Sequence, residues 1–127
     1  MVNRNTKQKE FVLNNLKNRF DHPTSQQIYD DAKKQGTKIG QVSIYRILNN
    51  LVKEGLVCKI VTKDNVAHFD YLRKNHIHLV CNNCNQIFDK NLGNDNNLTE
   101  LINDFNISMQ DVILYGICKN CKNNNVK

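Results

Sequence analysis

Apolar residues recur at helical spacing in three segments of the first half of the chain. Thr6 is predicted to cap the first helix, whose buried side carries Phe11, Val12, Leu16 and Phe20. Thr24 and Gln27 form a capping box for a second helix. Gly36 ends this helix, and its buried side carries Ile28, Tyr29 and Ala32. The pattern therefore predicts two short amphipathic helices in succession.

The third helical segment covers residues 41–54 and ends at Gly55. One side of this helix is apolar and carries Ile44, Ile47, Leu48, Leu51 and Val52. The opposite side is cationic and rich in amides, and it carries Ser43, Arg46, Asn49, Asn50 and Lys53. Two interpretations of this polar side stay open, namely a solvated helix face and a surface that contacts DNA.

Residues 56–62 and 66–71 are predicted to be the strands of a β-hairpin with its turn at residues 63–65. Three helices followed by a hairpin are typical of a winged helix-turn-helix, in which the third helix lies in the major groove. There Arg46 can bind guanine through two hydrogen bonds, and Asn49 and Asn50 can read adenine. Ser43 and Lys53 suit phosphates or base edges.

The second half of the chain predicts a small unit of strands and one helix. Strands are expected at 76–81, 85–90 and 109–118, with a helix at 98–105 that Thr99 or Asn97 begins. The fold class is therefore α+β, with three parts: an N-terminal winged helix-turn-helix over 1–71, a hinge at 72–75, and a small C-terminal α/β dimerisation domain with structural zinc over 76–127. So small a unit makes only a small core, and a second copy would help to cover its sheet.

Charge and composition narrow the compartment and the partner. The 127 residues carry a formal net charge of +6, which weakly favours a polyanionic partner such as nucleic acid. The chain opens with MVNRNTKQ, which is no apolar signal segment, and no stretch approaches the roughly 18 apolar residues of a membrane span. We therefore expect a cytoplasmic protein without a membrane partner. Thiols stay reduced there, and paired CxxC motifs usually bind metal.

Two CxxC motifs are the strongest chemical signal in the chain, and they comprise Cys81, Cys84, Cys118 and Cys121. Two such pairs supply the four thiolates of a tetrahedral zinc site, whereas disulfides or redox thiols are the alternatives. Four thiolates leave no open position for water or substrate, so this zinc should stabilise the fold and perform no chemistry. Cys58 stands apart among apolar residues and is expected to be a small buried side chain.

Imidazole and carboxylate groups indicate a second kind of metal site. On a strand over 76–81, His76 and His78 share one face and Cys81 lies on the other, so two sites are expected back to back. The two histidines are about 7 Å apart at Cα and can converge on one ion. On the second hairpin strand His68 and Asp70 share a face, and either could join them. Such ligands suit Fe(II), Mn(II) or Zn(II).

Five motifs together resemble the ferric uptake regulator family of bacterial metal-dependent repressors. They are HPTSQQIYD at 22–30, VSIYRILNNLVKEGLV at 42–57, HFDY at 68–71, HIHLVCNNC at 76–84 and YGICKNC at 115–121. The resemblance implies an N-terminal winged helix, a C-terminal dimerisation domain, a structural zinc and a regulatory metal that bridges the two domains. It also implies a homodimer bound to double-stranded DNA at an inverted-repeat operator. The DNA contacts it implies fall on the third helix and include Tyr45.

Within the family, the chain is most similar to the peroxide-sensing branch. That resemblance implies a regulatory Fe(II) or Mn(II) ion on His22, Asp70, His76, His78 and Asp89. With Fe(II), hydrogen peroxide would oxidise His22 or His76 and release the DNA, whereas Mn(II) would keep the repressor insensitive to peroxide. By themselves, His22 could simply begin a helix and Asp89 could close a turn. His68 is not among the implied ligands.

The chain also departs from the family pattern at three points. Ser43-Ile44-Tyr45-Arg46 stands where the family usually has Thr-Val-Tyr-Arg, and Gly40 stands where a capping Ser is common. His22 lies close to the start of the sequence, so we expect the extra N-terminal helix that many members use against DNA to be missing or truncated. These departures concern operator preference and affinity.

The sequence predicts a metal-dependent DNA-binding repressor that senses peroxide, and the alternative is an iron- or zinc-responsive repressor of the same family. A zinc hydrolase needs an open zinc position and a nearby general base. The only glutamates, Glu10, Glu54 and Glu100, do not lie beside the histidines in sequence, and no HExxH occurs, so we expect no enzyme. A zinc ribbon that binds RNA or protein would explain the cysteines but would leave the third helix and His22 unexplained.

Overall fold

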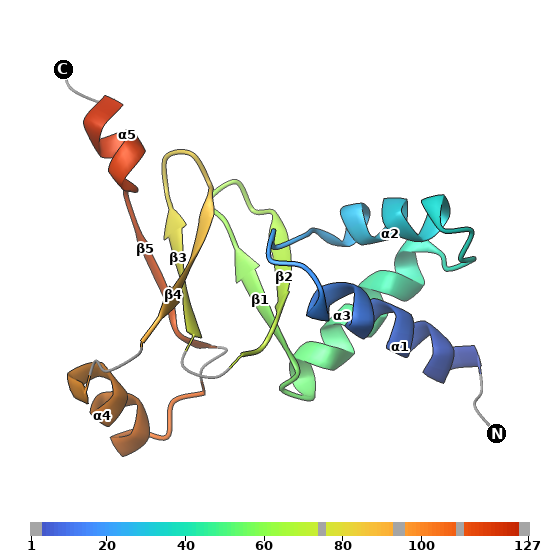
Figure 1. Ribbon diagram of the computed structural model, residues 1–127, viewed down its shortest axis with the longest axis horizontal. Helices are drawn as coiled ribbons and strands as arrows, with labels where there is room; N and C mark the ends of the chain where they lie inside the picture. The colour runs from blue at the N-terminus through green and yellow to red at the C-terminus, as the bar shows by residue number, and fades with distance from the viewer. Residues whose placement is uncertain (1–3, 74–75, 93–95, 109–110, 125–127) are drawn as a thin grey trace. The chain divides into compact units, whose positions relative to one another are not determined.

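The computed structural model describes residues 4–73, 76–92, 96–108 and 111–124 (Figure 1). The chain divides into two compact units. The first comprises Met1–Lys59 with Ala67–Tyr71, and the second comprises Ile60–Val66 with Leu72–Lys127. Residues 74–75 of the expected hinge lie outside the described part of the chain. Among the described residues, every helix is too short or too polar to cross a membrane.

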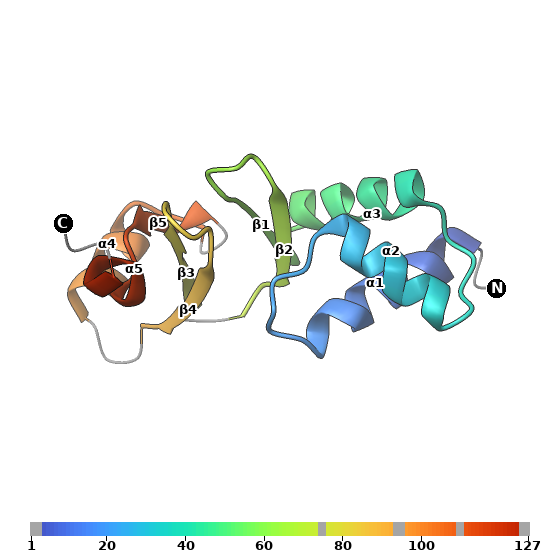
Figure 2. The same cartoon turned by 90° about the horizontal axis from the view of Figure 1, so that it is seen from above.

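Three helices build the first unit, namely α1 (Arg4–Lys17), α2 (Ser25–Lys34) and α3 (Gln41–Lys53). Helix α3 packs against both α1 and α2 (Figures 1 and 2). The apolar sides predicted from the periodicity meet in one core, which contains Val12, Leu16, Ile28, Ala32, Ile39, Ile44, Leu48, Leu51, Val57 and Phe69. Burial of these side chains is the main force that holds the three helices together.

The ends of α2 confirm the predicted capping signals. The Gln27 backbone N–H donates to Thr24 Oγ1 at 3.2 Å, and the Thr24 N–H donates to the Gln27 side-chain oxygen at 2.8 Å. At the other end Gly36 has φ 75°, a left-handed conformation that costs glycine little. The Thr37 N–H then donates to the Ala32 carbonyl at 2.9 Å, which closes the last turn.

Two predictions about the first helix are wrong. Helix α1 already includes Arg4, so Thr6 lies in its first turn and does not cap it. Phe20 is 62% exposed because α1 ends at Lys17, and the helical spacing that would bury Phe20 does not continue past that residue. The segment after α1 is instead held by Arg19, whose guanidinium binds the carboxylates of Asp21 and Asp31.

The predicted hairpin is formed by β1 (Val57–Val61) and β2 (Ala67–Tyr71), which make a two-stranded sheet. In its turn the Thr62 N–H donates to the Val66 carbonyl at 3.1 Å, and Asn65 adopts a left-handed φ of 65°. Phe69 of β2 is completely buried in the helical core, so one face of the strand belongs to that core.

The second unit contains a three-stranded sheet in the order β4-β3-β5 (Figure 1). Strand β3 (His76–Cys81) pairs antiparallel with β4 (Ile87–Asn91) and parallel with β5 (Ile113–Gly116). Helix α4 (Asn96–Asp104) adds Ile102 to a small core with Ile77 and Leu92. The α+β class predicted from the sequence is confirmed.

Three details of this unit differ from the sequence prediction. Helix α4 already includes Asn96, so neither Asn97 nor Thr99 begins it. The last strand is shorter than residues 109–118, since β5 covers Ile113–Gly116, and Met109 and Gln110 lie outside the described residues. A short helix, α5 (Lys119–Asn124), follows it and was not predicted. Its six residues, KNCKNN, contain no apolar period, so the hydrophobic pattern carries no signal for it.

Candidate metal centres and nucleic-acid interface

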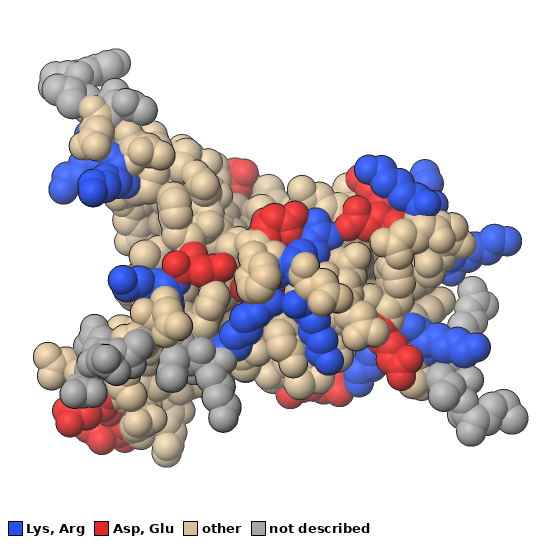
Figure 3. Space-filling model, viewed as in Figure 1, with Lys and Arg blue, Asp and Glu red and all other residues tan. Residues whose placement is uncertain are grey.

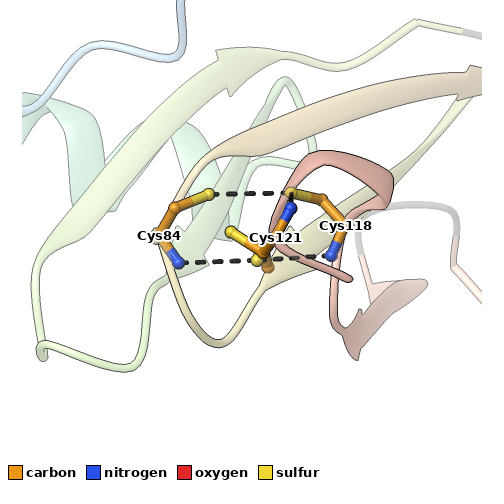
Figure 4. A group of neighbouring side chains, drawn as sticks. Cys84, Cys118 and Cys121 are labelled. Carbon is orange, nitrogen blue, oxygen red and sulfur yellow. Dashed lines mark hydrogen bonds between the residues drawn. The ribbon is translucent and has the colours of Figure 1, made fainter. Parts of the chain in front are cut away.

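The four cysteines of the CxxC motifs lie together in the second unit, with their Sγ atoms all within 4.8 Å of one another. Cys84 Sγ lies 3.9 Å from Cys118 Sγ (Figure 4). A tetrahedral zinc ion with Zn–S bonds of about 2.3 Å holds its sulfur atoms about 3.8 Å apart. The cluster therefore fits one zinc ion bound by four thiolates.

The elements around this cluster explain how distant parts of the chain meet. Cys81 ends β3, and Cys84 lies in the turn that follows it. Cys118 follows β5, which pairs with β3 in parallel, and Cys121 lies in the short helix α5. The parallel pairing of β3 and β5 thus brings the two CxxC motifs to the same edge of the sheet.

Backbone N–H groups prepare one of these thiols for metal binding. Cys81 Sγ accepts hydrogen bonds from the N–H groups of Cys118 at 3.3 Å, Cys84 at 3.4 Å and Asn83 at 3.4 Å. These bonds, the one from Cys118 above all, lower the pKa of Cys81 to about 6. Because the thiolate is the form that binds metal, Cys81 is available to a cation at neutral pH.

A second group of donors lies on the β3–β4 pair. His78 stands opposite Asp89 in the antiparallel register, and His76 and His78 point to the same face of β3. Asp89 Oδ1 lies 2.9 Å from His76 Nε2 and 3.3 Å from His78 Nε2. The centroids of the two imidazole rings are 5.0 Å apart. Two imidazoles and one carboxylate therefore converge on a small volume, on the strand face opposite Cys81.

A third group of donors lies in the first unit, where His22 and Asp70 meet. His22 Nε2 is 3.7 Å from Asp70 Oδ2, and both side chains are buried. That separation is too long for a good hydrogen bond, but it is within the range of about 3–4 Å expected for two donors on one metal ion. His22 adopts a left-handed φ of 53°, which is unusual for a residue with a side chain.

Sequence reasoning left His68 without a defined role, and the structure gives it a contact. His68 Nδ1 lies 2.8 Å from the backbone carbonyl oxygen of His22. The sequence indicated only that His68 and Asp70 share one face of β2. The contact between His68 and His22 could not be predicted, because the two residues are far apart in the sequence.

The polar side of α3 is exposed in the first unit. Arg46, Asn50 and Lys53 line an open groove of about 550 Å³ with Gln8 and Lys9 of α1, and Lys9 pairs with Glu54 at 2.7 Å. On the face drawn in Figure 3, Lys and Arg side chains project from the helices, with Asp and Glu between them. The groove joins three of the predicted DNA contacts to α1, which the sequence had not implicated.

Tyr45, at the other edge of the same side, is 44% exposed. A hydrogen bond with the Asn49 side chain and the charge of Lys59 lower the pKa of its hydroxyl, and Lys59 Nζ lies 5.8 Å from the ring centroid. Lys59, on β1, was not predicted as part of this surface. Tyr45 and Asn49, two of the predicted DNA contacts, thus lie on the part of α3 that approaches Lys59 of the hairpin.

These features define a winged-helix protein that carries a cysteine metal centre and two groups of imidazole and carboxylate donors. Residues 2–117 match the ferric uptake regulator family, and the chain belongs to that family. As a member, it is a metal-responsive transcriptional repressor. The family is one of dimeric DNA-binding regulators.

Two curated relatives are peroxide-responsive repressors named PerR. The protein of Staphylococcus epidermidis is 29% identical over 120 residues, which cover 92% of this chain and 80% of the relative. The protein of Staphylococcus aureus strain USA300 is 28% identical over 120 residues, with 92% and 81% of the two chains covered.

Solved structures of the family share the fold. The Campylobacter jejuni peroxide stress regulator superposes with a TM-score of 0.74 at 29% identity and covers 93% of this chain and 91% of its own. The Helicobacter pylori ferric uptake regulator superposes with a TM-score of 0.71 at 24% identity, covering 94% and 84% respectively. The second similarity is evidence for the fold alone.

Proposed function

We propose that this chain is a peroxide-sensing repressor in which one regulatory Fe(II) or Mn(II) ion is bound by both compact units. The observation that carries this proposal is that each unit holds an incomplete set of similar donors. The first unit offers His22 and Asp70, 3.7 Å apart, and the second offers His76, His78 and Asp89. Each set alone is short of a full coordination shell, and mixed imidazole and carboxylate ligands suit Fe(II) or Mn(II).

A metal ion bound by donors from both units would restrict the angle between them. In a dimer, one such angle places the two α3 helices at the spacing of successive major grooves, which implies an inverted-repeat operator. The ion needs to bind the chain with the restricted angle only about 100-fold more tightly than the unrestricted chain, a difference of about 2.7 kcal/mol. That difference is enough to change operator occupancy appreciably. Metal concentration would thereby control DNA binding.

Peroxide would end this state by modifying a ligand. Bound Fe(II) supplies the one-electron chemistry that activates hydrogen peroxide. In the net reaction the C2–H bond of the His22 or His76 imidazole is replaced by a bond to oxygen, the ring loses two electrons, and the remaining peroxide oxygen leaves as water. The resulting 2-oxo-histidine is a poorer ligand, so the ion would no longer link the two units. The angle between them would then be unrestricted, and the DNA would be released.

The cysteine cluster is proposed to hold Zn(II) permanently. The spacing of its four sulfur atoms supports this assignment. Since four thiolates complete a tetrahedral shell, this ion would stabilise the second unit and would not exchange during regulation.

A second copy of the chain is proposed to cover the apolar face beside β5. Leu114, Tyr115 and Ile117 are each about half exposed, at 51%, 52% and 52%. A largely apolar groove of about 450 Å³ lies next to them and is also lined by Leu79 and Phe88. Exposed apolar surface of this kind indicates a protein interface, and it supports the homodimer that an inverted repeat requires.

The proposal is tested with zinc-loaded protein and an inverted-repeat duplex selected from a randomised library. We expect binding with Mn(II) or Fe(II), weak binding after chelation of the regulatory ion, and peroxide-induced release only with Fe(II). Mass spectrometry should then find one added oxygen atom on a peptide containing His22 or His76. Retained DNA binding with unchanged peptides would instead indicate the alternative, an iron- or zinc-responsive repressor that peroxide does not switch.

A further inference from the structure

We propose that His68 is a positioning residue for the regulatory metal site, because it holds the backbone of His22 in the conformation that presents the His22 imidazole. This inference rests on the proposed function, since it concerns one ligand of the same ion. The sequence offered His68 only as a further candidate donor, and the family resemblance does not include it among the ligands.

Three consecutive residues of β2 hold the two-residue segment at His22 and Pro23. His68 Nδ1 contacts the His22 carbonyl oxygen at 2.8 Å, and the Phe69 backbone N–H donates to the Pro23 carbonyl at 2.8 Å. Asp70 Oδ2 lies 3.7 Å from His22 Nε2. The side chains of His68 and Asp70 both approach His22, whereas the Phe69 side chain is buried in the helical core.

The contact defines which nitrogen of His68 carries hydrogen. A backbone carbonyl oxygen can only accept a hydrogen bond, so Nδ1 of His68 must be the donor. Asn is the nearest replacement, because its side-chain amide places an N–H group close to the position of Nδ1. An apolar side chain of similar size, such as Leu, fills the space but offers no donor.

His22 needs such support because its backbone is in an unfavourable conformation. A residue before proline prefers extended φ values, and His22 has φ 53°. Left-handed conformations of residues with side chains persist where the surroundings impose them. Without the His68 hydrogen bond, the peptide before Pro23 would relax toward the extended region, and the imidazole would turn away from Asp70.

Other contacts hold the residues on either side of this segment. On the preceding side, Arg19 binds Asp21 through Nε and Nη2, each at 2.7 Å. On the following side, the capping box of Thr24 fixes the start of α2. His68 contacts the backbone of His22 itself, so we expect its removal to affect the ligand more than the fold.

The test compares wild type with His68→Leu, His68→Asn and a control, Phe69→Leu, as zinc-loaded full-length proteins. The control loosens β2 packing but keeps the backbone N–H that binds Pro23. Free Mn(II) is measured by electron paramagnetic resonance to obtain the affinity. Oxidised histidine is mapped after Fe(II) and peroxide on the tryptic peptides covering residues 20–33 and 75–90, which separate His22 from His76.

We expect His68→Leu to weaken Mn(II) binding by about 10-fold to 100-fold, the range found when a group that orients a metal ligand is removed. Its added oxygen should shift from the His22 peptide to the His76 peptide. His68→Asn should restore both properties, and Phe69→Leu should lower the melting temperature without changing either.

Three results would overturn the inference. The first is wild-type Mn(II) affinity in His68→Leu, and the second is equal weakening in His68→Leu and Phe69→Leu, which would show a purely structural role. The third is failure of the wild type itself to bind Mn(II) outside the cysteine cluster. That result alone refutes the proposed function as well, so the two failures are distinguishable.

Discussion

Asp89 Oδ1 lies 2.9 Å from His76 Nε2, although the two residues belong to different strands. The antiparallel pairing of β3 and β4 creates this contact, because it places His76 beside Asn91 and His78 beside Asp89 on one face of the sheet. The Asp89 carboxylate therefore contacts both histidines, and its removal should alter the position of both imidazoles.

Asp89→Ala should shift Mn(II)-dependent DNA binding to higher Mn(II) concentration while leaving the zinc content unchanged. It removes one donor of the second unit, and we expect Mn(II) affinity to fall by at least about tenfold. Titration of Mn(II) against a labelled inverted-repeat duplex measures the loss, and atomic absorption measures the zinc. Normal Mn(II) dependence in Asp89→Ala would exclude Asp89 from the regulatory site.

Cys121→Ser should release zinc and unfold α5 and the sheet edge around it. Structural zinc sites contribute apparent binding free energies of about 10 kcal/mol or more to folding, so loss of one thiolate should lower the melting temperature markedly. Cys58→Ala is the matched control, since Cys58 is buried in β1 and is not one of the four clustered cysteines. It should keep one zinc ion per chain. Equal zinc loss in both variants would contradict a site made of four cysteines.

Arg46→Ala should weaken specific DNA binding by about 1–3 kcal/mol and relax base preference at one position of each half-site. Arg46 is exposed on α3 beside Asn50 and Lys53, where a guanidinium can bind guanine through two hydrogen bonds. Lys34→Ala, at the end of α2, removes the same charge from a different helix and should have little effect on base preference. Identical losses on all duplexes for Arg46→Ala would indicate a phosphate contact instead.

Gly36→Ala should destabilise the first unit by about 1 kcal/mol. Its φ of 75° is left-handed, and no atom within 4 Å opposes an added methyl group, so the cost is backbone strain alone.

Gly40→Ser should instead stabilise α3 by a few tenths of a kcal/mol, because Gly40 is an N-cap without a side-chain hydrogen bond. Chemical denaturation of the zinc-loaded protein measures both, and a destabilising Gly40→Ser would refute the capping argument.

The local elements were largely predictable because they depend on neighbours in the sequence. The capping box of Thr24 and Gln27 and the apolar side of α3 involve residues within one or two helical turns. The prediction that Phe20 is buried was wrong, because periodicity indicates which side of a helix is apolar but not where the helix ends. Helix α5 had no apolar period and was missed.

By itself the sequence determined the residue types of both proposed metal sites, since CxxC spacing and the alternation of His76 and His78 are local properties. Only the tertiary structure decided that parallel pairing of β3 and β5 brings the two CxxC motifs together, and that β2 lies beside His22. Those contacts join residues far apart in the chain, and their existence depends on the packing of whole elements. The role inferred for His68 therefore became visible only when the folded backbone placed its Nδ1 against the carbonyl oxygen of His22.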